Sequence, residues 1–101
     1  MAWFGVRHVL QNDTNFEERV TVWQASSFEE AMSLARQEAK EYADGALYDG
    51  HVLGLFQAYE LFEPPGHGAE VFSLIRASQL APDDYVRHFY DTGEELVVDM
   101  P

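Results

Sequence analysis

Residues 3–25, WFGVRHVLQNDTNFEERVTVWQA, predict a β-hairpin that sets the fold class. Residues 3–10 and 18–25 are rich in β-branched and aromatic side chains, which are typical of strands. Residues 11–15 between them are dominated by asparagine, aspartate and threonine, which favour a turn. The two strands are therefore expected to pair antiparallel.

One register of this hairpin is preferred on the pattern of its apolar residues. Pairing Phe4 with Val22 and Leu10 with Phe16 places the apolar even-numbered residues of both strands on one face. The same register brings two pairs together on the other face: Trp3 with Trp23, and Arg7 with Arg19. A slip by one residue would bury arginine and expose valine, so we expect the register without the slip.

A helix is predicted directly after the hairpin. Ser26 and Ser27 are each followed three residues later by glutamate, the spacing of a capping box. Apolar residues then recur at helical spacing until Gly45, which ends the pattern. The helix is therefore expected to run for about five turns.

The remaining chain predicts a second hairpin and a second helix. Residues 51–63 are apolar on both faces and too long for a typical strand, so a bend is expected at Gly54. Residues 69–77 are expected to return as a strand beside it. Pro82 suits the first turn of a helix that ends at Gly93.

Together these elements predict an α+β fold of order ββαββα, with an antiparallel sheet of about four strands and two helices packed on one face. We expect a single domain over residues 1–101, with its core within residues 3–93. Residues 94–101 form an acidic and apolar tail, expected to be an edge strand or flexible. The second face of the sheet would stay partly open and would carry a mixed set of side chains: Trp3, Arg7, Arg19, Thr21 and Trp23.

Composition limits the classes of partner. The chain has 18 acidic and 6 basic residues, a net charge of −12, which disfavours binding to nucleic acid and to anionic membranes and favours a basic protein partner. It has no cysteine, and no apolar run long enough to cross a membrane. Its first eight residues lack the layout of a signal peptide, so we expect a cytoplasmic protein.

Six residues are candidate binding residues: Trp3, Arg7, Arg19, Trp23, Tyr59 and Glu60. A tryptophan pair beside arginines is typical of interface hot spots, although another part of the same domain could equally cover the tryptophans. Two facing arginines repel each other unless an anion lies between them. That anion is either an internal carboxylate, such as Glu17 or Glu60, or a bound carboxylate or phosphate ligand.

No catalytic or metal-binding motif is assembled in the sequence. The four histidines lie on separate predicted elements without metal-ligand spacing, so we expect neither a metal site nor a cofactor. His8 is expected opposite Glu18 on the inner face as a structural pair. The acidic pair Asp83 and Asp84 opens the second helix, where carboxylates are favoured by the helix dipole without any chemistry.

The sequence also resembles a bacterial family known as domain of unknown function 4288. The similarity rests on five short segments spread over residues 3–90, namely residues 3–7, 16–20, 27–31, 59–61 and 70–76. The resemblance implies no activity. It points to a set of recurring charged residues: Arg7, Glu17, Glu18, Arg19 and Glu60.

Two functions follow from these observations. The first is a non-enzymatic protein-interaction domain, either an inhibitor or immunity-type protein for a basic partner or a homodimer joined through the helix-free sheet face. The alternative is a small-molecule binder or small enzyme in which Arg7 and Arg19 hold an anionic group. Its acid–base chemistry would come from Glu18, Glu60 or His8. The absence of an assembled catalytic motif favours the first.

Overall fold

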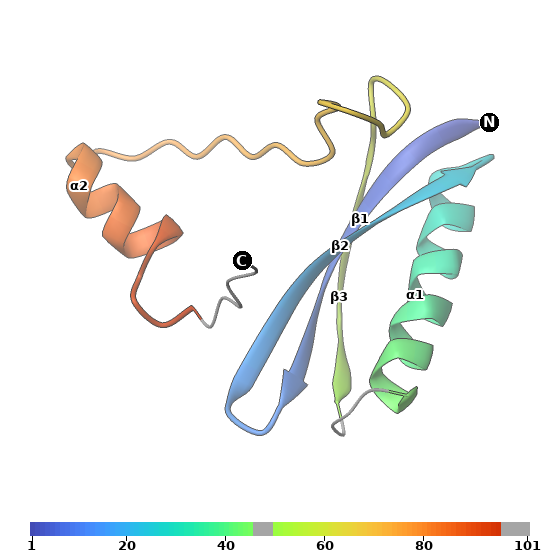
Figure 1. Ribbon diagram of the computed structural model, residues 1–101, viewed down its shortest axis with the longest axis horizontal. Coiled ribbons are helices and arrows are strands. Elements are labelled where there is room, and N and C mark those ends of the chain that lie inside the picture. Colours follow the sequence, from blue (N-terminus) through green and yellow to red (C-terminus); the bar gives the residue numbers. More distant parts are fainter. Residues whose placement is uncertain (46–49, 96–101) are drawn as a thin grey trace.

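The structure is a computed structural model that describes residues 1–45 and 50–95, so most of the predicted tail, residues 96–101, lies outside the described residues. Three strands and one long helix form the folded body: β1 (Ala2–Asn12), β2 (Asn15–Ala25), α1 (Phe28–Gly45) and β3 (His51–Glu60). Further along the chain, α2 (Pro82–Tyr85) continues directly into the π-helical segment η1 (Val86–Tyr90) (Figure 1). The fold is α+β. No helix in the described part of the chain is long and apolar enough to cross a membrane.

The strands form an antiparallel sheet of order β2-β1-β3, with β1 in the centre. β1 and β2 are joined by a two-residue turn at Asp13 and Thr14, in which Asp13 has a φ of 55°. Aspartate tolerates this left-handed conformation better than most residues. Because Asn12 pairs with Asn15 across so short a turn, the register of the whole hairpin is set by the turn.

The preferred register of the sequence analysis is therefore wrong by one residue. Phe4 lies opposite Trp23, not Val22, and Leu10 lies opposite Glu17, not Phe16. Since successive side chains of a strand point to opposite faces, this slip moves every side chain of β2 to the other face of the sheet. The physical reason is the turn, which has two residues where a longer one was expected.

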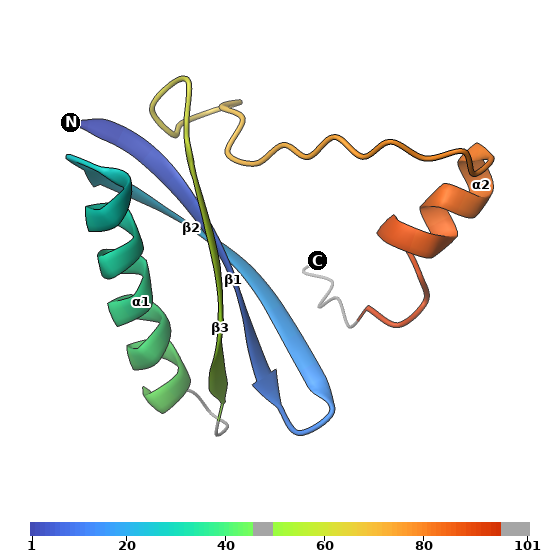
Figure 2. The ribbon, with the colours of Figure 1, turned by 180° about the vertical axis from the view of Figure 1, so that it is seen from behind.

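Helix α1 covers one face of the sheet, and its start follows the predicted capping pattern (Figures 1 and 2). Ser27 Oγ accepts a hydrogen bond of 3.1 Å from the backbone N–H of Glu30, whose carboxylate in turn accepts from the backbone and hydroxyl of Ser26. The face toward the sheet is a stripe of buried alanines: Ala31, Ala35, Ala39 and Ala43. These small side chains let the helix backbone approach the sheet closely.

The core between α1 and the sheet is small. Phe4 and Val6 of β1 pack there with Ala25, Ala31 and Ala35. The ring of Phe4 meets that of Phe28 edge-on, with centroids 4.8 Å apart. From β3, Phe56 and Ala58 pack against this cluster. Where β3 passes Gly54 its register against β1 shifts, between His8 and Leu10, in agreement with the predicted bend.

A fourth strand was expected at residues 69–77, but within the described chain these residues pair with no strand. They run as an extended segment away from the sheet and lead into α2 and η1 (Figures 1 and 2). The second helix does form where Pro82 predicts it, yet neither α2 nor η1 packs against a strand or α1. The expectation of two helices on one face is therefore wrong. We call residues 69–90 the arm.

Candidate functional site

The face of the sheet opposite α1, here called the open face, carries exposed apolar side chains. Register places on it the following residues: Trp3, Arg7, Val9, Phe16, Val20, Val22 and Tyr59. Phe16, Val20 and Val22 alternate along β2 and are 61%, 40% and 36% exposed. The three β2 residues were not expected here, because the predicted register assigned them to the core. The signal that could have found them is the length of the turn.

The two tryptophans do not form a pair. Trp3 lies opposite Gln24 on the open face, whereas Trp23 lies opposite Phe4 on the face covered by α1. Trp23 packs against the core, and its Nε1 donates a hydrogen bond of 2.7 Å to Thr21 Oγ1. The expected cross-strand pair is wrong because of the one-residue slip. For Trp23 the alternative interpretation is correct, namely that another part of the same domain covers the side chain.

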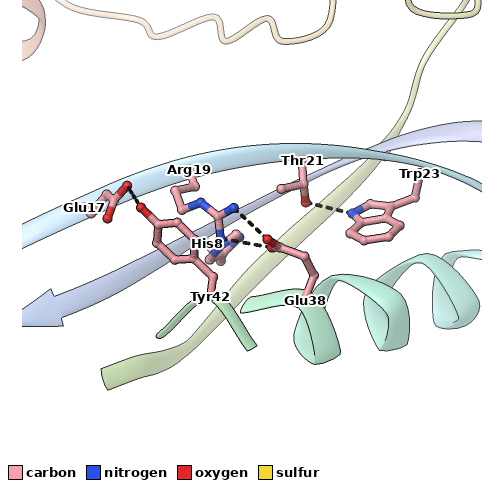
Figure 3. A network of polar contacts seen from close by, with 7 residues as sticks. All are labelled: His8, Glu17, Arg19, Thr21, Trp23, Glu38 and Tyr42. Carbon is pink, nitrogen blue, oxygen red and sulfur yellow. Dashed lines mark hydrogen bonds and ion pairs between the residues drawn. The ribbon is translucent and has the colours of Figure 1, made fainter. Parts of the chain in front are cut away.

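The two arginines likewise lie on opposite faces. Arg7 is opposite Val20, and Arg19 is opposite His8. Arg19 lies under α1, where its guanidinium donates to both carboxylate oxygens of Glu38 at 3.0 and 2.9 Å (Figure 3). The bidentate pair with Glu38 raises the pKa of Arg19. Neither arginine faces the other, so no anion is needed between them.

The Arg19 guanidinium belongs to a larger polar network between β2 and α1 (Figure 3). Its Cζ lies 3.7 Å from the centre of the Tyr42 ring, and the Tyr42 hydroxyl donates a hydrogen bond of 2.8 Å to Glu17. The slip in register therefore does not leave the half-buried arginine unsatisfied. Helix α1 supplies both a carboxylate and an aromatic face for it.

His8 is buried within the same network. It lies opposite Arg19, not Glu18 as expected, and its Nε2 is 3.3 Å from Arg19 Nη1. Since an arginine can only donate, Nε2 accepts and the imidazole is neutral. The ring stacks on Phe56 with centroids 5.2 Å apart, and Nδ1 has no hydrogen-bond partner among the described residues. Burial, and then the nearby Arg19, lower the pKa of His8, while Glu38 and Glu17 oppose this shift.

On the open face, Arg7 is held by weaker contacts. Its guanidinium pairs with Glu18 at 3.6 Å and donates a hydrogen bond of 3.4 Å to Gln57. It also lies over the ring of Phe72, at 4.8 Å from the ring centre. Phe72 belongs to the arm, so Arg7 joins the open face to the start of the arm.

Tyr59 fixes the same junction. Its ring lies over Gly5, close enough that a β-carbon at position 5 would be 2.5 Å from Cε2 and Oη. Its hydroxyl donates a hydrogen bond of 2.6 Å to the carbonyl of Val71, and its ring lies 6.0 Å from that of Phe72. Burial raises the pKa of Tyr59, although nearby Arg7 acts in the opposite direction.

Glu60 lies one residue further and is exposed. It lines a cavity of about 310 Å³ between the end of β3 and the start of the arm, together with Glu63 and Glu70. In register it lies opposite Phe4, away from both arginines. Of the six candidate residues, the structure thus brings Trp3, Arg7 and Tyr59 together on the open face and separates Arg19, Trp23 and Glu60 from them.

Within residues 1–45 and 50–95, no three histidine or acidic side chains come together as metal ligands would. Comparisons with protein-family models, with curated proteins and with solved structures gave no match. The functional interpretation therefore rests on the geometry of the chain itself.

Proposed function

We propose that this protein is a non-enzymatic protein-interaction domain whose binding surface is the open face. The observation that carries the proposal is the register of β2, which turns Phe16, Val20 and Val22 away from α1 and leaves them exposed. Apolar surface gains about 25 cal/mol per Å² when it is removed from water. An apolar stripe along a sheet is typical of a surface that another protein covers.

The acidic remainder of the surface bears on the kind of partner. With a net charge of −12, the protein attracts basic proteins at long range and repels nucleic acid. An inhibitor or immunity-type protein for a basic enzyme would use this attraction, which weakens as salt rises. A cytoplasmic location and self-association through the open face belong to the same proposal.

The geometry gives less support to an anionic ligand held by Arg7 and Arg19 together. The two side chains lie on opposite faces, and Glu38 already occupies the guanidinium of Arg19. The resemblance to domain of unknown function 4288 stays a prediction and carries no activity. The proposal therefore depends on the open face alone.

Site-specific photo-crosslinking tests the proposal. A photo-reactive amino acid at Val22 probes the open face, and the same group at Leu34 serves as the control, because Leu34 is 38% exposed on α1. We expect protein adducts from position 22, in purified protein or in lysate, and few from position 34. Equal labelling from both positions, or none from position 22, would contradict the proposal.

A further inference from the structure

The arm is an apolar segment that, among the described residues, packs on its own sheet only at its start. Its large apolar residues are exposed: Val71, Phe72, Leu74, Ile75, Leu80, Val86, Phe89 and Tyr90. Ile75 is 97% exposed. The arm touches its own sheet near Val71 and Phe72, through Tyr59 and Arg7, and then leaves it. Both views show it projecting from the side of the sheet opposite α1 (Figures 1 and 2).

The arm nevertheless has internal order. Arg76 donates a hydrogen bond of 3.0 Å to the hydroxyl of Tyr85, and its guanidinium lies 4.2 Å from the centre of the Phe89 ring. Tyr85 and Phe89 pack together with centroids 5.0 Å apart. These contacts tie the extended part of the arm to its helical end. The arm is therefore a shaped unit with exposed apolar side chains.

The extended part of the arm, residues 70–80, adds no strand to the described sheet. Among the described residues, no backbone hydrogen bond joins residues 70–80 to any strand. The radius of gyration is 15.5 Å, against about 13 Å for a compact domain of this length. An extended apolar segment whose backbone is not part of a strand ladder is well suited to pack on another chain.

The open face is the counterpart of the arm. It exposes Phe16, Val20 and Val22, which α1 on the other side of the sheet cannot reach. Within the described residues, one chain thus presents an apolar face with exposed side chains and, beyond Phe72, an apolar segment that packs on no strand. The exposed face and the exposed segment are both buried when two copies exchange their arms about a two-fold axis.

Charge indicates a second copy in preference to a basic partner at this surface. The arm carries five formally charged residues, nearly balanced in sign: Glu70, Asp83 and Asp84 against Arg76 and Arg87. On the open face, Arg7 and Glu18 pair with each other. Two surfaces that are close to neutral can meet without repulsion in a protein whose net charge is −12. A basic partner would find little acidic charge on either.

We infer that the protein forms an arm-exchanged homodimer, in which the arm of each copy covers the open face of the other. This inference rests on the proposed function and names the occupant of its binding surface. The contacts of Tyr59 and Arg7 with the start of the arm set the direction in which the arm leaves its own sheet. The acidic outer surface of α1 stays free in this dimer.

Two charge substitutions test the exchange, one on each surface. Val22→Lys places a cation on the open face, and Ile75→Asp places an anion on the arm. Because Ile75 is almost fully exposed, Ile75→Asp leaves the fold of a single chain intact. Leu34→Lys is the matched control on α1. Circular dichroism and melting temperature check that each variant is folded; if Val22→Lys is not, Phe16→Lys replaces it, since Phe16 is 61% exposed.

Light scattering after size exclusion gives the oligomeric state. We expect a dimeric wild type, a dimeric Leu34→Lys, and a dissociation constant raised about tenfold or more in each of the other two variants. Mixing Val22→Lys with Ile75→Asp should restore the dimer. A mixed pair has one unaltered arm on one unaltered face, and its second interface sets lysine against aspartate.

Three results would overturn the inference. The first is a monomeric wild type, and the second is a dimer that forms despite either substitution. The third is a mixture of the two variants that does not associate, which is the result expected if the open faces of two copies contact each other directly. The crosslinking at position 22 distinguishes a failure of the arm-exchange inference from a failure of the proposed function. A monomer that still crosslinks to a different protein in lysate rejects the exchange alone, whereas a monomer without any adduct rejects both.

Discussion

Tyr59 lies across Gly5 so closely that no other residue fits at position 5 without displacing the tyrosine ring. A β-carbon there would be 2.5 Å from Cε2 and Oη of Tyr59. The same ring holds Val71 through its hydroxyl and contacts Phe72. A glycine in the central strand thus makes room for the side chain that attaches the arm to the open face.

Gly5→Ala is expected to lower the free energy of unfolding by about 1–3 kcal/mol, because the added methyl group pushes the Tyr59 ring away from Val71. The same change in a Tyr59→Ala background should cost much less, since the ring that it meets is absent. Urea denaturation of both single variants and the double variant measures this coupling. An equal cost in both backgrounds would show that the two residues are independent.

Glu38→Gln is expected to destabilise the protein by about 1–3 kcal/mol, because it removes the charged partner of half-buried Arg19. Glu41→Gln is the matched control on the same helix, since Glu41 is exposed and accepts a hydrogen bond from Gln37 only four residues away. Its effect should be within about 0.5 kcal/mol. Thermal and urea unfolding of the two variants make the comparison, and equal losses would exclude a stabilising role for the Arg19–Glu38 pair.

The buried imidazole of His8 predicts a loss of stability on acidification. Its pKa is lowered from 6.5 in the folded state, so the unfolded chain binds the proton more tightly. The stabilising contribution of neutral His8 is fully present above pH 6.5 and is lost as the pH falls below it. His8→Phe keeps a ring to stack on Phe56 and cannot titrate.

The measurement for His8 is the free energy of unfolding against pH for the wild type and for His8→Phe. The wild type should lose more stability than the variant as the pH falls from 7 to about 5. All residues other than position 8 are the same in both proteins, so their contribution largely cancels in the difference. A wild type that gains stability relative to the variant in this range would contradict the shift in the His8 pKa.

The net charge of −12 predicts that added salt raises the melting temperature by screening self-repulsion. A gain of 1 kcal/mol corresponds to about 4–8 °C in a domain of this size. Calorimetry between low and moderate concentrations of sodium chloride gives the result. A melting temperature that stays constant or falls would mean that repulsion among the acidic residues does not limit stability.

Local sequence signals predicted the elements better than their arrangement. The helix starts at the Ser27 cap and ends at Gly45 as its pattern indicates, and the bend near Gly54 is found in β3. Residues 69–77 are extended, as their composition favours, but they pair with no described strand. Extended conformation is a local preference, whereas strand pairing needs a partner whose position the local sequence does not encode.

For the candidate site, the prediction was correct for one strand and wrong for the next. Trp3 and Arg7 lie on the open face as expected, but Arg19 and Trp23 lie under α1. The prediction assumed that burying an arginine costs too much. In the structure Glu38 and Tyr42, both from α1, compensate that cost. These contacts join residues about 20 positions apart, so pattern along a single strand could not reveal them.

The sequence by itself determined three of the four expected strands, the capped helix, the helical end of the arm and the acidic surface, because propensity, capping and charge act between near neighbours. Only the tertiary structure decided which face of β2 is covered. A turn of two residues sets that register, and α1 supplies partners for the polar side chains of β2 that the register turns toward it. The same register leaves Val20 and Val22 exposed and so makes the open face apolar.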